Sequence, residues 1–254
     1  MTDLFDDILP ADRVLVAGTD DYQHDEALGP APQPPLAVLL PVDAGEVAAI
    51  LRVCDGHGIP VTARGSGTGL SGAAIPVEGG VVVCFERMKA IEIDDENQVA
   101  VVQPGVTLAE LDEVTAAHGL TYPVYPGEYS ASIGGNVATN AGGMRAVKYG
   151  VTRHQVLGLQ AVLPSGEVIR TGGRFVKGST GYDLTQLLIG SEGTLALVTE
   201  ATLRLYPRSP HVATVLAPFR TLEEVMHAVP RIVASGIGPL ILEYIDVLTM
   251  SGMT

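Results

Sequence analysis

The amino-acid sequence predicts an α+β fold in which small sheets and packing helices form a two-part domain, followed by the start of a second domain. Two observations carry this prediction. With 254 residues, 46% of them hydrophobic, the chain can bury a substantial core. Strand-like and helix-like segments alternate at the beginning of the chain, whereas its middle contains consecutive strands.

The first elements are expected to form a strand, helix, strand unit. Residues 3–9 are a short acidic helix candidate, and the proline-rich stretch after them favours extended chain. A strand is predicted at 36–40. A helix follows at 43–58, where an aspartate can cap the first turn and a glycine can end the last. A second short strand at 60–63 leads into a glycine-rich loop.

The middle of the chain is expected to be rich in strands. A strand at 80–85 is followed by two more within 90–105, joined at 94–97 by a turn rich in Asp and Asn. A helix over 107–119 begins at a threonine cap and ends at a glycine. The pattern therefore indicates a sheet with helices packed against it.

A hairpin and a long strand complete the predicted principal domain. Strands at 156–164 and 167–172 are joined by a Ser-Gly turn. A helix at 183–191 then leads into a strand over 194–207.

The last part of the chain predicts half of a small two-layer unit: a strand at 211–219, a helix at 221–236 and a strand at 239–247. We expect this second domain to be incomplete at Thr254. The predicted N-terminal segment, principal domain and incomplete second domain span 1–35, 36–207 and 208–254.

Composition excludes several classes of protein. A net charge of −14 argues against a broad contact with a nucleic-acid backbone. Cys54 and Cys84 have no His or Cys neighbour at metal-ligand spacing and are expected to be buried thiols in a reducing compartment. No pair of histidines has metal-binding spacing, so no metal site is expected. There is no leader pattern and no apolar run long enough to span a membrane, so we predict a soluble, cytoplasmic protein.

The segment RGSGTGLSG, residues 64–72, predicts a binding loop for phosphate. A simple tight turn needs one or two glycines, whereas this loop follows a strand and contains four, interleaved with Ser and Thr. Its backbone N–H groups can converge on an anion. The spacing matches neither the P-loop nor the Rossmann pattern.

A second glycine-rich segment, residues 131–143, predicts a surface for a flat ligand. Small residues alternate here with the polar residues Ser132, Asn136, Thr139 and Asn140, and no charge occurs before Arg145. A ligand can approach the main chain closely at such a strip. Together the two segments predict a long ligand with a phosphate part and a planar part.

Three long motifs occur in order. RGSGTGLSG is followed by ASIGGNVATNAGG with AVKYGVT, and then by VKGSTGYDLTQLLIGSEGTLALVTEATLRL. Over residues 36–207 the chain thereby resembles the FAD-binding domain of the FAD-linked oxidase superfamily, of the vanillyl-alcohol oxidase and para-cresol methylhydroxylase (PCMH) type. The likeness is greatest to the glycolate oxidase large subunit and to D-lactate and D-2-hydroxyglutarate dehydrogenases. It implies a PCMH-type domain of two subdomains, followed by the start of a ferredoxin-like cap domain.

The resemblance implies FAD as the cofactor, with its diphosphate on the amides of the first loop and its flavin near the second segment. The implied cofactor-binding residues are Arg64, Gly65, Ser66, Gly67, Thr68, Gly69, Leu70, Pro126, Ser132, Ile133, Gly134, Gly135, Asn136, Thr139, Gly142, Glu192, Gly193 and Val198. Relatives with covalently attached FAD often carry a histidine in the first loop. None of residues 64–72 is His, so non-covalent FAD is expected. Many relatives have a serine pair after Pro126, where this chain has Gly127 and Glu128, so contacts there stay open.

The resemblance also implies oxidation of a small 2-hydroxy acid to a 2-oxo acid, with hydride transfer to the flavin. The catalytic residues would come from the cap domain and from sequence beyond Thr254. The electron acceptor is left open. One alternative is a FAD-binding module or subunit that is inactive without its C-terminal part or a partner chain, and a homodimer is also left open. Another is a nicotinamide-dependent reductase of the cell-wall precursor pathway, which shares the fold.

Overall fold

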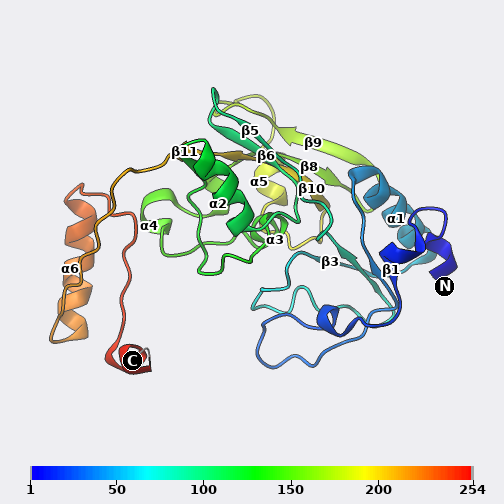
Figure 1. Cartoon of the computed structure of the whole chain (residues 1–254), viewed down its shortest axis with the longest axis horizontal. Helices are drawn as coiled ribbons and strands as arrows, with labels where there is room; N and C mark the ends of the chain where they lie inside the picture. The colour runs from blue at the N-terminus through cyan, green and yellow to red at the C-terminus, as the bar shows by residue number, and fades with distance from the viewer. Residues whose placement is uncertain (1, 253–254) are drawn as a thin grey trace.

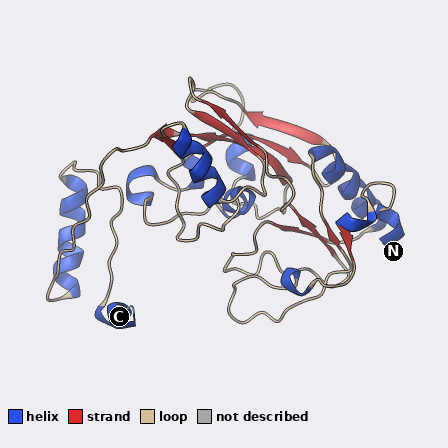
Figure 2. Ribbon diagram, in the orientation of Figure 1, coloured by secondary structure: helices blue, strands red, loops and turns tan. Residues whose placement is uncertain are grey.

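The computed structural model describes residues 2–252, so Thr254, where we expected the second domain to be incomplete, lies outside the described residues. Two sheets lie side by side and helices pack against them, whereas the C-terminal helices lie apart (Figure 1). Figure 2 shows the strands of both sheets meeting near the middle of the molecule. The mixture of helices and sheets confirms the predicted α+β class.

The first sheet contains four short strands in the order β1-β2-β4-β3. They are β1 (Val14–Leu15), β2 (Val38–Leu39), β3 (Val61–Arg64) and β4 (Val81–Cys84). β2 and β3 run parallel to β4, and β1 is antiparallel to β2. Every residue of β4 is buried, as expected for the middle strand of a covered parallel sheet.

Helix α1 (Ala44–His57) makes the crossover between β2 and β3. The Asp43 side chain accepts a hydrogen bond from Glu46 N at 2.9 Å, and the helix ends at Gly58 in the left-handed conformation, with φ 63°. Both ends therefore match the predicted caps. The buried face comprises Val47, Ala48, Ile50, Leu51 and Cys54.

The second sheet is antiparallel and has the order β5-β6-β10-β8-β9. Its strands are β5 (Ile91–Asp94), β6 (Val99–Val102), β8 (Val156–Val162), β9 (Val168–Gly172) and β10 (Leu197–Arg204). The predicted hairpins pair β5 with β6 and β8 with β9. The long last strand, β10, inserts between them.

Short helices cover this second sheet. They are α2 (Leu108–Ala117), α3 (Ile133–Thr139) and α5 (Leu184–Leu188). The one-turn helix α4 (Ala146–Tyr149) buries none of its residues. α2 has a capping box in which Thr107 and Glu110 each satisfy the other's backbone N–H. A small sheet pairs β7 (Leu120–Thr121) with β11 (Tyr206–Pro207).

The remaining helical turns are of the 3₁₀ type: η1 (Thr2–Phe5), η2 (Ala11–Arg13), η3 (Asp20–Tyr22) and η4 (Thr152–His154). The helix predicted at 3–9 is therefore wrong in type and length. Phe5 and Leu9 are buried, and their packing against the core holds this segment in a tight turn rather than an α-helix.

Two main apolar cores correspond to the two sheets. The larger one lies between the second sheet and helices α2, α3 and α5. The other one packs α1 and the N-terminal segment on the first sheet, and it also contains Val162 and Leu197 from the second sheet. Because these two residues belong to β8 and β10, one core joins the sheets.

The strands predicted at 211–219 and 239–247 are wrong. Within residues 2–252 neither segment pairs with a strand, and most of their side chains are exposed. A strand needs a hydrogen-bonded neighbour, and neither sheet offers one here. The helix between them does form, as α6 (Leu222–Ala234), and α7 (Val247–Gly252) follows.

Candidate cofactor-binding site

Residues 64–72, here called the glycine loop, begin at the end of β3 and carry a row of unpaired donors. No amide of residues 66–71 donates a hydrogen bond to any residue that the structure describes. Gly67 and Gly72 have φ of 74° and 80°, so the chain turns through conformations that favour glycine. Free N–H groups in such a turn can hold an anion.

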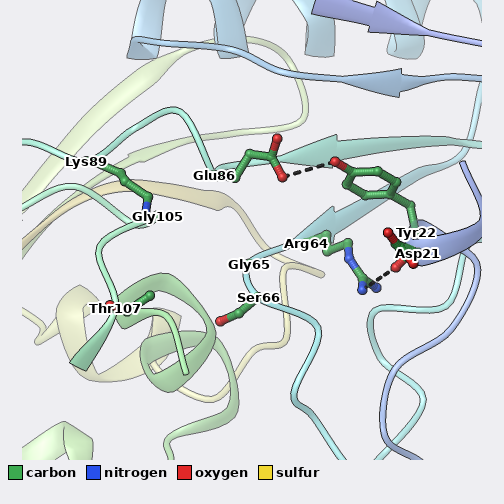
Figure 3. A pocket seen from close by; sticks show the side chains of 9 residues that line it. All are labelled: Asp21, Tyr22, Arg64, Gly65, Ser66, Glu86, Lys89, Gly105 and Thr107. Atoms are coloured by element: carbon green, nitrogen blue, oxygen red, sulfur yellow. Dashed lines mark hydrogen bonds between the residues drawn. The ribbon is translucent and has the colours of Figure 1, made fainter. Parts of the chain in front are cut away.

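A cavity of about 330 Å³ opens beside the start of the glycine loop (Figure 3). Tyr22 donates a hydrogen bond to Glu86 Oε2 at 3.1 Å, and Cys84 Sγ lies 3.6 Å from the same oxygen. Burial raises the pKa of both Tyr22 and Cys84 to about 12, and the charge of Glu86 adds to this rise for Tyr22. Both groups are therefore neutral donors at pH 7. The cavity is lined by Asp21, Tyr22, Arg64, Gly65, Ser66, Glu86, Lys89, Gly105 and Thr107.

A second, smaller cavity of about 60 Å³ is also lined by Gly65, and we call it the intersheet cleft. Its wall combines residues of both sheets with small residues of α3 and of the segment before β10. The lining residues are Ala63, Arg64, Gly65, Phe85, Pro104, Gly134, Gly135, Ala138, Leu188, Ser191, Gly193, Ala196, Leu197 and Val198. Arg64 and Gly65 line both cavities, so the two cavities are adjacent at the start of the glycine loop. We call the two cavities together the trough.

The two predicted glycine segments touch each other at this trough. A Cβ atom placed on Gly65 would overlap Ser132 Oγ, and one on Gly134 would lie 2.6 Å from Pro104 Cβ. A Cβ on Gly193 would come within 3.4 Å of Ala63 Cβ. Glycine at these positions lets the backbones approach closely, and larger side chains would fill the cleft.

The second glycine segment forms α3 and does not present a row of free amides. Ile133 N donates to Val106 O at 2.8 Å, Gly134 N to Pro104 O at 2.9 Å, and Gly135 N to Ser132 Oγ at 3.2 Å. The free polar group is the side chain of Asn136. Its Nδ2 is buried without a hydrogen-bond partner among the described residues. A buried donor of this kind is suited to a polar ligand atom.

Not all of the predicted residues line a cavity with a free polar group. Arg64 lines both cavities, but its guanidinium already donates to backbone oxygens of the N-terminal segment. The residues that follow lie outside both cavities. Thr139 Oγ1 bonds to Gly135 O, within its own helix. Glu192 is exposed. The cavity linings also omit Gly67, Thr68, Gly69, Leu70, Pro126, Ser132, Ile133, Asn136 and Gly142.

Pro126 and Gly142 lie near each other at a separate place. A Cβ on the neighbouring Gly143 would overlap Tyr125 O and lie 2.8 Å from Pro126 Cα. Arg145 lies over the Tyr125 ring at 5.5 Å. The second segment therefore reaches from the intersheet cleft to the loop at 125–129.

Sequence reasoning missed some lining residues. Pro104 and Gly105 follow β6 after one intervening residue, and a Cβ on Gly105 would overlap Phe85 O. A Pro-Gly pair at a strand end marks a close backbone approach and could have been found. Tyr22 and Glu86 carry no such signal, because chain folding alone brings them together across 64 residues.

The fold, the row of free amides and the narrow cleft define a protein that binds an extended nucleotide cofactor. A family model described as FAD binding domain matches residues 35–172. The chain belongs to this family of FAD-binding domains, and FAD is its cofactor. The row of free amides and the glycine-lined cleft, which added Cβ atoms would fill, fit such a group.

Several curated proteins are similar to most of the chain. An uncharacterized FAD-linked oxidoreductase of Mycobacterium tuberculosis is 60% identical over all of this chain and 56% of its own length. A D-lactate dehydrogenase of Archaeoglobus fulgidus is 45% identical over 90% of this chain and 52% of its own length. A glycolate oxidase subunit of Bacillus subtilis is 45% identical over 85% of this chain and 46% of its own length. The chain thus spans about half the length of the curated relatives it matches.

Solved structures share the fold at lower identity. Alkyldihydroxyacetonephosphate synthase has a TM-score of 0.79 and 20% identity, covering 95% of this chain and 47% of its own. For p-cresol methylhydroxylase the TM-score is 0.72 and the sequence identity is 24%, and the match covers 83% of this chain and 43% of its own. These likenesses confirm the predicted PCMH-type fold.

Two features are absent from residues 2–252. No helix there is long and apolar enough to cross a membrane. No group of three or more His, Cys, Asp or Glu in that range is arranged to hold a metal ion.

Proposed function

We propose that FAD lies in the trough formed by the glycine loop and the intersheet cleft, and that the protein oxidises a small 2-hydroxy acid to the 2-oxo acid. One observation carries the proposal. The unpaired amides of residues 66–71 lie beside a cleft walled by Gly65, Gly134 and Gly193. A row of N–H donors suits a diphosphate, and a narrow wall of small residues suits the groups attached to it.

Each part of the trough has a distinct role in this proposal. The loop amides hold the diphosphate. Gly134, Gly193 and Val198 line the narrow part and exclude water from it. When bound, FAD supplies the hydride acceptor. The protein positions the cofactor and provides the electrostatic environment of the reaction.

The names of the relatives favour a 2-hydroxy acid as substrate, since both lactate and glycolate are of this class. The oxidation also needs a base for the hydroxyl proton. We keep the prediction that the catalytic residues come from the cap domain and from sequence beyond Thr254. Because the chain spans about half the length of these relatives, we propose that it binds FAD better than it oxidises substrate.

A second candidate is a FAD-binding subunit that acts only with a partner chain or with its C-terminal part. Two observations favour keeping it. One relative is named as a subunit of glycolate oxidase. In addition, Leu222, Met226 and Val233 of α6 expose more than half of their surface.

Anaerobic reduction distinguishes the candidates. The purified chain is loaded with FAD, and D-lactate, glycolate or NADPH is added while the flavin absorbance is followed. Bleaching by a 2-hydroxy acid supports the enzyme, whereas a bound flavin that no hydroxy acid bleaches supports the subunit. Bleaching by NADPH alone would contradict both candidates and support the nicotinamide-dependent reductase.

A further inference from the structure

The glycine loop is held by a segment outside the matched family region. Residues 20–27, here called the strap, lie against it, although the family match begins at residue 35. Figure 1 shows this part of the chain, in blue, beside the cyan loop below the first sheet. Glu26 N donates to Gly69 O at 2.9 Å, so the strap is bonded to the middle of the loop.

Arg64 makes the main connection between loop and strap. The side chain is buried, with 8% of its surface exposed. Its two terminal nitrogens donate to His24 O and Asp21 O, each at 2.6 Å, and Figure 3 shows the guanidinium beside Asp21 and Tyr22. Charged donors make the stronger class of hydrogen bond.

The Arg64 guanidinium also lies directly against the first turn of the glycine loop. A Cβ on Gly67 would come within 2.5 Å of Arg64 Cζ. Among the described residues Arg64 forms no ion pair with a carboxylate, because both bonds end on backbone oxygens. Its positive charge is therefore available to attract a phosphate held on the loop amides.

Asp25 of the strap lies against the middle of the loop and the residues that follow it. This residue is 6% exposed. It accepts from Ala27 N at 3.0 Å and from Ala74 N at 3.5 Å. A Cβ on Gly69 would lie 3.6 Å from Asp25 Oδ2. The strap thus contacts the loop at its start and middle, and it also contacts Ala74 just after the loop.

We infer that the strap is part of the cofactor site and that Arg64 and Asp25 are positioning residues that hold the amide row of residues 66–71 in its binding shape. The inference rests on the proposed function. It differs from the role implied by the family motif, in which the loop amides hold the diphosphate, since the Arg64 side chain acts by fixing the loop and by its charge.

The test measures the FAD dissociation constant by quenching of flavin fluorescence, together with urea unfolding of each FAD-free protein. Arg64→Ala should weaken FAD binding by more than about tenfold, because two charge-assisted hydrogen bonds are lost. Arg64→Lys keeps the charge without the planar guanidinium, so its FAD dissociation constant should lie between those of the wild-type protein and Arg64→Ala. Added guanidinium at low concentration should partly restore binding to Arg64→Ala. Asp25→Asn should weaken binding about threefold to tenfold.

Arg52→Ala is the matched control. Arg52 also donates to a backbone oxygen, Gly166 O at 3.0 Å, but this contact lies outside both cavities. The control should lose stability without losing FAD affinity. If Arg64→Ala binds FAD as tightly as Arg52→Ala, or if its loss of affinity only follows its loss of stability, the inference is wrong.

A measurement on the unchanged protein covers the case in which Arg64→Ala does not fold. Binding and loop order are coupled reciprocally, so FAD should slow hydrogen exchange in peptides that cover residues 20–27 as well as 64–72. Protection confined to 64–72 would overturn the inference while leaving the proposed function intact. A wild-type chain that does not quench flavin fluorescence would overturn the proposed function itself.

Discussion

Gly65 is the residue at which the two halves of the trough meet. A Cβ atom on Gly65 would overlap the Ser132 hydroxyl at the start of α3, and Gly65 belongs to both cavities. The sequence pattern predicted that loop 64–72 and segment 131–143 serve one ligand, but not this contact. In the structure Ser132 caps α3, and only the folded chain brings its side chain against Gly65.

Gly65→Ala tests this contact. The added methyl group would overlap Ser132 Oγ, so we expect a loss of about 1–3 kcal/mol in the free energy of unfolding, as for other overpacked positions. FAD affinity should fall as well, because the loop must move. Urea denaturation and a flavin fluorescence titration measure the two effects.

Gly56→Ala is the control for that substitution. Gly56 lies in α1, and a Cβ there has no atom within 4 Å. This change should stabilise the protein by about 0.5–1 kcal/mol and leave FAD affinity unchanged. Equal effects of the two substitutions would show that Gly65 is not specially packed.

The two thiols should be unreactive in the folded protein. Burial raises the pKa of Cys54 to about 11 and that of Cys84 to about 12, both from 9.0. The thiolate is the reactive form, so at pH 8 neither should react at the rate of free cysteine. A colorimetric thiol reagent should detect two thiols in urea and almost none without it. Rapid native reaction would contradict the buried placement of both residues.

At the scale of elements, the sequence predicted α1, α2 and both hairpins because their signals are local. Caps and turn residues at fixed spacing determine where those elements begin and end. α3 was not expected to be helical, since two glycines in seven residues oppose a helix. Its first amides are satisfied instead by residues 104–106, a contact that no local pattern reveals.

The strands at 211–219 and 239–247 failed for a related reason. Alternation of apolar residues predicts a face that can be buried, but not the neighbour that would pair with it. The glycine loop itself was predictable from composition. The strap was not, because its contacts with the loop run mainly through backbone atoms of residues 21, 24 and 26.

Paired substitutions test the exposed state of α6. Met226 is 65% exposed, so Met226→Ala should change the free energy of unfolding by less than about 0.5 kcal/mol. Leu111 of α2 is fully buried, and Leu111→Ala should cost about 2–5 kcal/mol. Urea denaturation of this chain measures both. A cost for Met226→Ala near that of Leu111→Ala would mean that the face of α6 is covered in solution.

At the scale of the whole molecule, the trough exists because two differently built sheets share a core. Val162 and Leu197 of the second sheet pack into the core of the first and fix the spacing between them. Leu197 also lines the intersheet cleft. Packing that joins the sheets therefore shapes the site, which explains why a motif on either half alone predicts only part of a ligand.

An NMR titration of isotope-labelled chain with FAD tests the central claim most directly. If the cofactor lies along the glycine loop and the intersheet cleft, the amide signals of residues 66–71 and of Gly134, Gly135 and Gly193 should shift and saturate at one FAD per chain. The signals of α6 should not move. Saturating shifts confined to other residues, or no shifts at all, would contradict the claim.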